Sequence, residues 1–316
     1  MTHDLICLGR ASLDLFADDI GAPFADVTRF SAYVGGSPTN VCVMAGRLGL
    51  KTAMITGLGG DYTSDFILKF LREEGVDTAY IVRKAGMQTN TVMVALQPPE
   101  HMQFVALHAN NADLALTIDD MLAAPLADCN MLLFSGMGLL SDPSRSATQY
   151  AAETARASGA TVFMDLDYRA PMWSDPRIYG VTARLSLALV DVAIGTEDEV
   201  RAAAGTDDLD AAVARLLPII HDALIVKRGA DGATVYRKDD SALHIPTYPV
   251  QVVNFLGAGD AFAGALLYAT HQGWTWERRL RFANAAGALI VSRQGTANAM
   301  PTYDEIMTLV EDNTHA

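Results

Sequence analysis

Short apolar runs alternate with longer amphipathic segments along most of the chain. The runs contain few polar residues, which is typical of strands whose two faces are both covered by helices. This pattern predicts an α/β fold with helices around a largely parallel sheet. The predicted strands span residues 5–8, 52–56, 131–135, 161–166, 190–194 and 223–226. The predicted helices span residues 37–48, 61–74, 144–158, 210–217, 258–272 and 276–293.

Residues typical of helix ends support some of these boundaries. Ser37 is predicted to cap the first helix, and Pro38 suits its first turn because proline lacks an N–H that would need a partner there. Gly75 follows the second helix, where a left-handed residue commonly ends a helix. A strand-like run at residues 250–253 precedes the helix that starts at residue 258.

Two segments, residues 11–34 and about 84–110, break the α/β rhythm. The second segment alternates apolar and polar residues on both sides of Pro98-Pro99, as two strands around a turn would. Long surface loops are the alternative, but strand-forming residues are dense for a loop. We therefore expect a small β lid over one end of the main sheet, within a single domain that spans residues 1–316.

Composition and charge limit the classes of binding partner that we expect for the protein. The chain has 316 residues, half of them hydrophobic, and a formal net charge of −14. An acidic surface argues against nucleic acid or an anionic membrane as a partner. A local nest of backbone N–H groups can nevertheless bind a phosphate group within an acidic protein. The absence of a signal-like or membrane-spanning run, together with three scattered cysteines interpreted as buried thiols, predicts a cytoplasmic protein.

The segment from Asn254 to Phe262 carries the clearest chemical signal. Gly257 and Gly259 permit positive φ and a close approach of a ligand to the backbone at the start of a helix. Successive N–H groups at a helix start bind anions, helped by the helix dipole. Asp260 follows in the first turn, where a carboxylate can accept a proton from a hydroxyl that attacks a phosphate. This arrangement indicates phosphoryl transfer.

Other nucleotide and metal motifs are missing. The chain contains no G-x-x-x-x-G-K-[ST] loop, and its residues 57–60 lack the third glycine of a dinucleotide motif because position 62 is Tyr. The histidines and cysteines show no zinc spacing. A non-catalytic protein that binds a sugar or nucleotide is a further alternative, although such a protein has no need of a base at Asp260.

Taken together, four short motifs resemble the PfkB, or ribokinase-like, carbohydrate kinases. One is the glycine-rich segment that contains Asp260, and another is Gly35-Gly36 followed by Asn40 at a helix start. Gly9 with Asp14, and Gly59-Gly60-Asp61, match the family at two further positions in the same order. The resemblance implies a three-layer sandwich with a mostly parallel central sheet and a small β lid. It also implies ATP and Mg²⁺ as cofactors and transfer of the γ-phosphoryl group to a hydroxyl of a small sugar.

The resemblance also implies roles for individual residues. Asp260 would be the catalytic base, beside an anion hole formed by the amides of Gly257, Ala258 and Gly259. The residues implied in sugar binding are Asp14, Gly35, Gly36 and Asn40. The residues implied at the nucleotide are Thr196, Glu199, Lys227, Gly229, Gly232 and Asn284.

Within that nucleotide group, Glu199 would hold Mg²⁺ through water. Thr196 stands where the family usually has Asn. For Asn284, the sequence allows two roles: a contact with adenine or packing between helices. The resemblance further implies a homodimer joined through the lids, and it raises a monovalent cation as an additional cofactor.

Several stretches resemble the 5-dehydro-2-deoxygluconokinase branch of this family, which acts in inositol breakdown. They include the Asn254 start of the glycine-rich segment and the stretch from Met164 to Arg169. Arg169 has either of two roles: a bidentate partner for a substrate carboxylate, or an ion-pair partner of Asp165 or Asp167.

The lid sequence departs from the pattern of sugar-acid kinases. Related sugar-acid kinases carry a Tyr-Arg pair on the lid where this chain has Leu107-His108, and His108 is a weaker carboxylate ligand than Arg. Fructose and 2-keto-3-deoxygluconate therefore remain alternative substrates, beside 5-dehydro-2-deoxygluconate.

Overall fold

A computed structural model of the chain describes residues 1–97, 101–107, 110–239 and 242–313. Its main sheet contains nine strands among these residues. In spatial order they are β13 (Leu243–Ile245), β12 (Ala233–Arg237), β11 (Ala223–Lys227), β10 (Val192–Thr196), β9 (Thr161–Asp165), β8 (Cys129–Ser135), β1 (His3–Leu8), β4 (Thr52–Leu58) and β5 (Ile81–Arg83). The strands from β11 to β5 pair in parallel, and β12 and β13 pair antiparallel at one edge.

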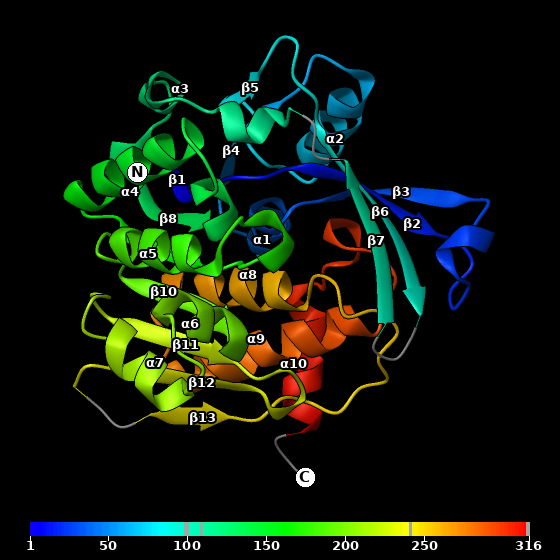
Figure 1. Cartoon of the computed structure of the whole chain (residues 1–316). Coiled ribbons are helices and arrows are strands. Elements are labelled where there is room, and N and C mark those ends of the chain that lie inside the picture. The colour runs from blue at the N-terminus through cyan, green and yellow to red at the C-terminus, as the bar shows by residue number, and fades with distance from the viewer. Residues whose placement is uncertain (98–100, 108–109, 240–241, 314–316) are drawn as a thin grey trace.

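Helices cover both faces of this sheet, so the molecule has three layers (Figure 1). One face packs against α1 (Ser37–Arg47), α2 (Tyr62–Glu73), α8 (Ala258–His271), α9 (Trp276–Val291) and α10 (Tyr303–Asp312). The other face packs against α3 (Ile118–Leu122), α4 (Ser144–Ala157), α5 (Pro176–Leu187), α6 (Glu197–Ala204) and α7 (Leu209–Leu216). Leu5 and Cys7 face the first layer of helices while Ile6 and Leu8 face the second, which explains the uninterrupted apolar runs.

The two segments that break the α/β rhythm form a second, smaller sheet, as predicted. Its strands are β3 (Phe30–Gly35), β2 (Ser12–Ala17), β6 (Asn90–Gln97) and β7 (His101–Leu107), in that spatial order. This sheet extends from one side of the main body (Figure 1). The predicted turn at Pro98-Pro99 lies outside the described residues.

The structure corrects two local predictions. Residues 250–253 form no strand, because the N–H groups of Val253 and Asn254 donate to the carbonyl of Val291, at 2.8 and 3.0 Å. This segment therefore lies beside the C-terminal end of α9 and joins no sheet. The cap of α1 is Gly36, whose φ of 96° is unsuited to other residues, and Ser37 is the first helical residue.

Sequence reasoning missed α3, α5, α6 and α10, and α5 shows one physical reason. Ile178, Val181 and Leu185 of α5 are exposed, at 47, 51 and 67%. Several small or polar residues of the same helix are buried instead, including Thr182 and Ala183. An apolar pattern that faces solvent hides the periodicity that predicts an amphipathic helix.

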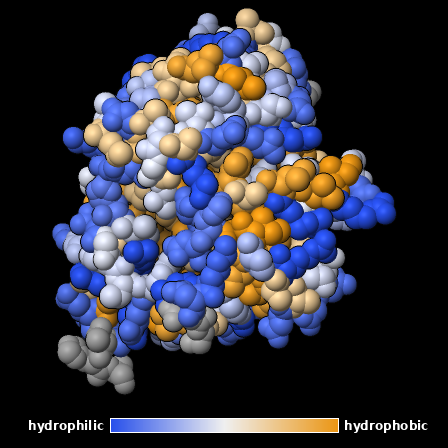
Figure 2. All heavy atoms as spheres, turned by 90° about the vertical axis from the view of Figure 1, so that its left-hand side faces the viewer, coloured by the Kyte–Doolittle hydropathy of each residue, from blue (hydrophilic) through white to orange (hydrophobic). Residues whose placement is uncertain are grey.

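Figure 2 shows one face of the molecule coloured by hydropathy: hydrophilic residues cover much of it, and hydrophobic residues gather right of centre and at the top. The cysteines Cys7, Cys42 and Cys129 are all buried, as predicted. Within the part of the chain that the structure describes, no helix combines the length and apolarity that a membrane crossing requires.

Gly57 offers a test of the packing that holds the main sheet against the loop after β7. A Cβ at Gly57 would lie 2.1 Å from the carbonyl oxygen of Ala112, so the backbone itself would have to move. We expect Gly57→Ala to lower the free energy of unfolding by roughly 1–3 kcal/mol, the usual cost of overpacking, in a urea titration. Gly60→Ala is the control, because no atom lies within 4 Å of its added Cβ. Equal stability of the two variants would contradict this prediction.

Candidate active site

The carboxyl ends of the parallel strands bring the predicted site residues together at one edge of the main sheet. Asp165 ends β9, Thr196 ends β10 and Lys227 ends β11, while Gly9 follows β1 directly. Neighbouring parallel strands all end at the same sheet edge, and ligand sites of open α/β sheets lie there. Residues far apart in sequence thus surround one region.

Asp260 lies where the starts of α1 and α8 meet. The amide of Asn40 donates a hydrogen bond from Nδ2 to Oδ2 of Asp260, at 2.7 Å. Gly257 caps α8 with a φ of 82°, a left-handed conformation that favours glycine. Burial raises the pKa of Asp260, and hydrogen bonds from Asn40 and Ser37 bring it part of the way back. The carboxylate is therefore fixed in orientation and has a greater affinity for a proton than an exposed aspartate.

Asn254 braces the turn that leads into α8. Its Oδ1 accepts a hydrogen bond from the N–H of Leu256 at 2.9 Å, and its Nδ2 donates to the carbonyl of Gly295 at 3.0 Å. The next residue, Thr296, donates from Oγ1 to the carbonyl of Val34 on β3, at 2.9 Å. A continuous set of contacts thus links the glycine turn to the small sheet.

Asp14 projects from β2 into a space that glycines keep open. A Cβ at Gly35 would lie 1.8 Å from Oδ2 of Asp14, so this carboxylate requires glycine on the neighbouring strand. At Gly36, a Cβ would lie 2.4 Å from the carbonyl oxygen of Arg10. Burial raises the pKa of Asp14 to about 6, against the effect of a hydrogen bond that Ser12 donates at 2.7 Å. The charge of Asp260 raises the pKa of Asp14 further, and the charge of Arg10 lowers it.

A buried polar cluster next to Asp14 escaped sequence reasoning. Arg10 forms an ion pair with Asp113, with 2.7 Å between Nε and Oδ2, and their side chains are 12 and 5% exposed. Several buried atoms around it lack a hydrogen-bond partner among the described residues: Nη2 of Arg10, Oδ1 of Asp113, both amide atoms of Asn111, and Oδ1 of Asn90 and Asn40. Buried polar atoms are normally satisfied, so this cluster fits water or a polar ligand. The sequence signal that could have revealed this cluster is Arg10 itself, a charged residue two positions after a buried strand.

Arg169 forms an ion pair with Asp167, one of the two partners considered from the sequence. Its Nε lies 2.8 Å from Oδ1 of Asp167, and attraction to that carboxylate raises the pKa of the guanidinium further. The side chain of Arg169 is 59% exposed, and a guanidinium carries five donors. The pair therefore leaves Arg169 able to contact a second anion. His108 lies outside the described residues.

A cavity of about 680 Å³ lies beside the start of α8. Residues from the predicted nucleotide set and the glycine turn line it: Thr196, Lys227, Gly229, Gly232, Ala258, Gly259 and Asn284. Apolar side chains cover another part of its wall: Tyr248, Pro249, Val250, Val252, Phe255, Phe262, Ala288 and Val291. A mixed wall of this kind suits a ligand with a flat apolar part and a charged part.

Three members of the predicted nucleotide set, Asn284, Thr196 and Glu199, also have structural partners. Nδ2 of Asn284 donates to the carbonyls of Ile245 and Pro246 at 2.9 and 3.1 Å, so a packing role is present in the structure. Thr196 and Glu199 form a reciprocal capping box at the start of α6, in which Glu199 accepts from the N–H of Thr196 at 2.7 Å. Glu199 is not among the residues that line the cavity.

The described residues contain no cluster of three or more His, Cys, Asp or Glu side chains that would bind a metal ion alone. Mg²⁺ does not require such a cluster, since it commonly combines one or two carboxylates with water and substrate phosphates. Asp165 is one carboxylate close to the cavity, since its Oδ2 lies 3.4 Å from Nζ of Lys227, which lines the cavity.

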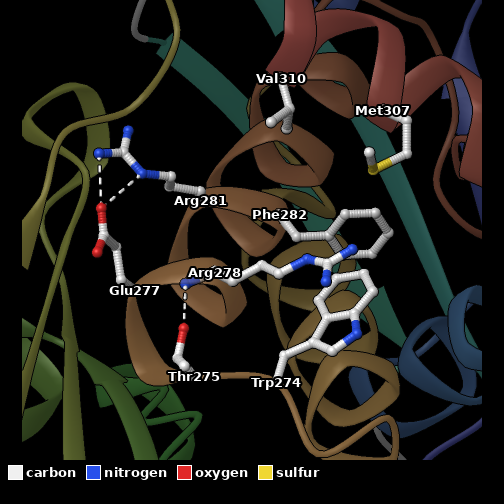
Figure 3. Close-up of a pocket in the computed structure, with 8 residues that line it drawn as sticks. All are labelled: Trp274, Thr275, Glu277, Arg278, Arg281, Phe282, Met307 and Val310. Carbon is white, nitrogen blue, oxygen red and sulfur yellow. Dashed lines mark hydrogen bonds and ion pairs between the residues drawn. The ribbon is translucent and has the colours of Figure 1, made fainter. Parts of the chain in front are cut away.

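A second hollow, of about 200 Å³, lies between α9 and α10 and contains none of the predicted site residues. Figure 3 shows the guanidinium of Arg278 over the ring of Trp274, which are 3.7 Å apart. Met307 and Val310 of α10 line the opposite side. None of its lining residues comes from the sheet edge that gathers the predicted site residues.

Comparisons with known proteins agree with the geometry. The chain is 32% identical to a 5-dehydro-2-deoxygluconokinase of Shouchella clausii over 98% of its own length and 96% of that protein. A second protein of the same name, from Geobacillus thermodenitrificans, is 31% identical over 98% of this chain and 93% of that one. A crystal structure of a fructokinase from Xylella fastidiosa with bound ATP aligns with a TM-score of 0.89 and 27% identity, covering 99% of this chain and 100% of that one.

The family comparison covers nearly the whole chain as well. A family model described as pfkB family carbohydrate kinase matches residues 2–303. The predicted three-layer fold and kinase class are thereby confirmed. The chain belongs to the pfkB family of carbohydrate kinases.

Proposed function

We propose that this protein transfers the γ-phosphoryl group of ATP to a hydroxyl of a small keto sugar acid, with 5-dehydro-2-deoxygluconate as the substrate. The observation that carries the proposal is the position of Asp260. Its carboxylate accepts a hydrogen bond from Asn40 at the start of α1, and Gly259, the residue before it, lies against the ammonium of Lys227 in the cavity wall. A base between a hydroxyl-binding region and a phosphate-binding region is what phosphoryl transfer requires.

The cavity beside α8 is the proposed nucleotide site. Its apolar wall suits adenine, while Lys227 and the backbone of Gly229, Ala258 and Gly259 suit phosphates. The family relative from Xylella fastidiosa was solved with ATP, and a fructokinase from Vibrio cholerae with fructose, ADP and calcium. Mg²⁺, when bound with the nucleotide, would neutralise phosphate charge, and Glu199 is the proposed residue that holds it through water.

The proposed sugar site lies between the small sheet and the start of α1. Asp14 accepts hydrogen bonds from sugar hydroxyls, and Gly35 and Gly36 let the substrate approach the backbone. Asn40 contributes to the site while it orients Asp260. A raised pKa makes Asp260 a stronger proton acceptor, which suits removal of the proton from the attacking hydroxyl.

The choice of a keto acid rests on similarity and on Arg169. Curated relatives with 31–32% identity carry the name 5-dehydro-2-deoxygluconokinase. Arg169 keeps donors available beyond its bond to Asp167, so it can bind a substrate carboxylate. Fructose and 2-keto-3-deoxygluconate are the second candidates, because the fructokinases share the fold and Leu107-His108 replaces the expected Tyr-Arg pair.

Asp260→Asn tests the base. We expect the variant to fold normally and to lose kcat by roughly a hundredfold or more, since an amide cannot accept the proton. The measurement is ADP release with Mg-ATP and a panel of 5-dehydro-2-deoxygluconate, 2-keto-3-deoxygluconate, fructose, ribose and adenosine. Asp210→Asn, in the first turn of α7, is the matched control and should leave kcat unchanged.

Three outcomes of that assay would count against all or part of the proposal. A variant at Asp260 that keeps most of its kcat is incompatible with a catalytic base. A wild-type protein that releases ADP with none of the sugars would favour a binding protein over this enzyme. A preference for fructose would retain the kinase and change the substrate.

Arg169→Ala tests the carboxylate contact. We expect kcat/KM for keto acids to fall at least tenfold and kcat/KM for fructose to change little, because a charge-assisted pair to a carboxylate is lost. Arg177→Ala is the control, since Arg177 pairs with Asp175 at the same two-residue spacing on the surface. Equal losses for acidic and neutral sugars would show that Arg169 supports the fold instead of selecting the substrate.

The small sheet is the proposed lid, and its edge is the proposed dimer interface of a single-domain cytoplasmic protein. β7 is an edge strand on which Phe104, Val105 and Leu107 are 52, 43 and 51% exposed. Contiguous exposed apolar residues on an edge strand favour association with a partner.

Light scattering during gel filtration tests this interface. We expect a dimer for the wild type and a monomer for Phe104→Asp, because a buried unpaired charge opposes association. Val181→Asp, at a similarly exposed position of α5, should remain dimeric. A monomeric wild type would refute the interface.

A further inference from the structure

Lys227 holds a buried positive charge next to the glycine turn. Its side chain is 13% exposed, and its ammonium Nζ lies 3.4 Å from Oδ2 of Asp165, which is 4% exposed. Asp165 is in turn oriented by the N–H of Asp167, which donates to its Oδ1 at 3.2 Å. An ammonium group has three protons to donate, so this one long bond leaves it able to bind a further acceptor.

The ammonium also lies against the backbone of Gly259. A Cβ built on Gly259 would be 2.9 Å from Nζ of Lys227, so a side chain at this position would displace the ammonium group. Gly259 lines the cavity and directly precedes Asp260. The positive charge is therefore located in the cavity wall beside Gly259, the residue before the carboxylate that we propose as the base.

The charges around Lys227 are mostly negative. Burial alone would lower the pKa of Lys227, but attraction to Asp165, and then to Glu199 and Asp260, raises it above its usual value. The lysine consequently keeps its proton. Phosphate oxygens close to carboxylates need a cation beside them, and Lys227 is the cation that these carboxylates surround.

We propose that Lys227 binds the phosphoryl group while it is transferred, and that Asp165 is a positioning residue that holds the ammonium beside Gly259. This inference rests on the proposed kinase function and assigns a step within it. In that step the bond between the γ-phosphorus and the bridging oxygen breaks, and its electron pair leaves with ADP. A bond forms between the sugar oxygen and phosphorus, and the hydroxyl proton passes to Asp260.

This role of Lys227 differs from ordinary nucleotide binding because it stabilises the transition state more than bound ATP or ADP. Charge on the three equatorial oxygens of the phosphoryl group is exposed during transfer, so a cation aimed at them lowers the barrier. A lysine that contacted the other phosphates would instead stabilise bound ADP and bound ATP equally, which changes KM and leaves kcat alone. These two cases can be separated by experiment.

Lys227→Met keeps the length of the side chain and removes its charge. We expect kcat to fall about a hundredfold or more, with the dissociation constant for ADP changed by less than about threefold. The second readout is the affinity for ADP in the presence of aluminium fluoride and MgCl₂, which mimics the phosphoryl group in transfer. This affinity should fall by about the same factor as kcat.

The variants are chosen so that misfolding cannot produce the expected result. Lys227→Met leaves Asp165 buried without its cation, which destabilises the fold. The double variant Lys227→Met, Asp165→Asn removes both charges, so it should fold and show the same loss in kcat. Asp165→Asn alone retains the ammonium group, and we expect a smaller loss in kcat with unchanged ADP affinity.

Lys84→Met is the control for removal of a partly buried lysine. Lys84 pairs with Asp120 at 2.5 Å, and neither residue lines the cavity. The inference is wrong if both Lys227 variants retain kcat. It is also wrong if their affinity for ADP alone falls by the same factor as their affinity for ADP with aluminium fluoride. In either case the kinase function stands. If aluminium fluoride fails to tighten ADP binding to the wild type, the proposed function and this inference fall together.

Discussion

The close contact between α1 and α8 determines where Asp260 lies. A Cβ at Gly264 would lie 2.6 Å from Cβ of Met44 and 3.0 Å from the carbonyl of Val41, so the two helices approach each other as closely as a glycine allows. One turn toward the start of each helix, this contact brings the amide of Asn40 to the carboxylate of Asp260. The orientation of the proposed base therefore depends on a packing contact in the core, away from any substrate.

The second constraint on the site is the burial of several carboxylates together with the cations that pair with them. Burial raises the pKa of Asp14 to about 6 and that of Asp165 to about 7, although Lys227 opposes the shift at Asp165. Ionised carboxylates buried together are unfavourable in free energy. Cations and hydroxyl groups that bind there offset this cost, so the region is suited to binding them. Arg10, Arg169 and Lys227 are each held by an aspartate, so the positive charges are already oriented. Groups oriented in advance do not have to reorganise during the reaction.

Most of the fold could be predicted from the sequence because its strands are buried on both faces and its glycine motifs are local. The failures have physical causes that a single sequence hides. Residues 250–253 look like a strand but bond to the end of α9, and α5 exposes its largest apolar residues. At the site, the segment around Asp260 was readable because its residues are neighbours in sequence. The pairs Arg10–Asp113 and Lys227–Asp165 join residues far apart in the chain, so only the topology brings them together.

The contacts of Asn254 and Thr296 join parts of the molecule that differ in architecture. Through them the turn before α8 is bonded to Gly295, and the residue after Gly295 is bonded to β3 of the small sheet. The small sheet also supplies Asp14 and Gly35. The two halves of the site are consequently connected by hydrogen bonds, so a displacement of β3 would be passed through Thr296 and Asn254 to the backbone that precedes Gly257.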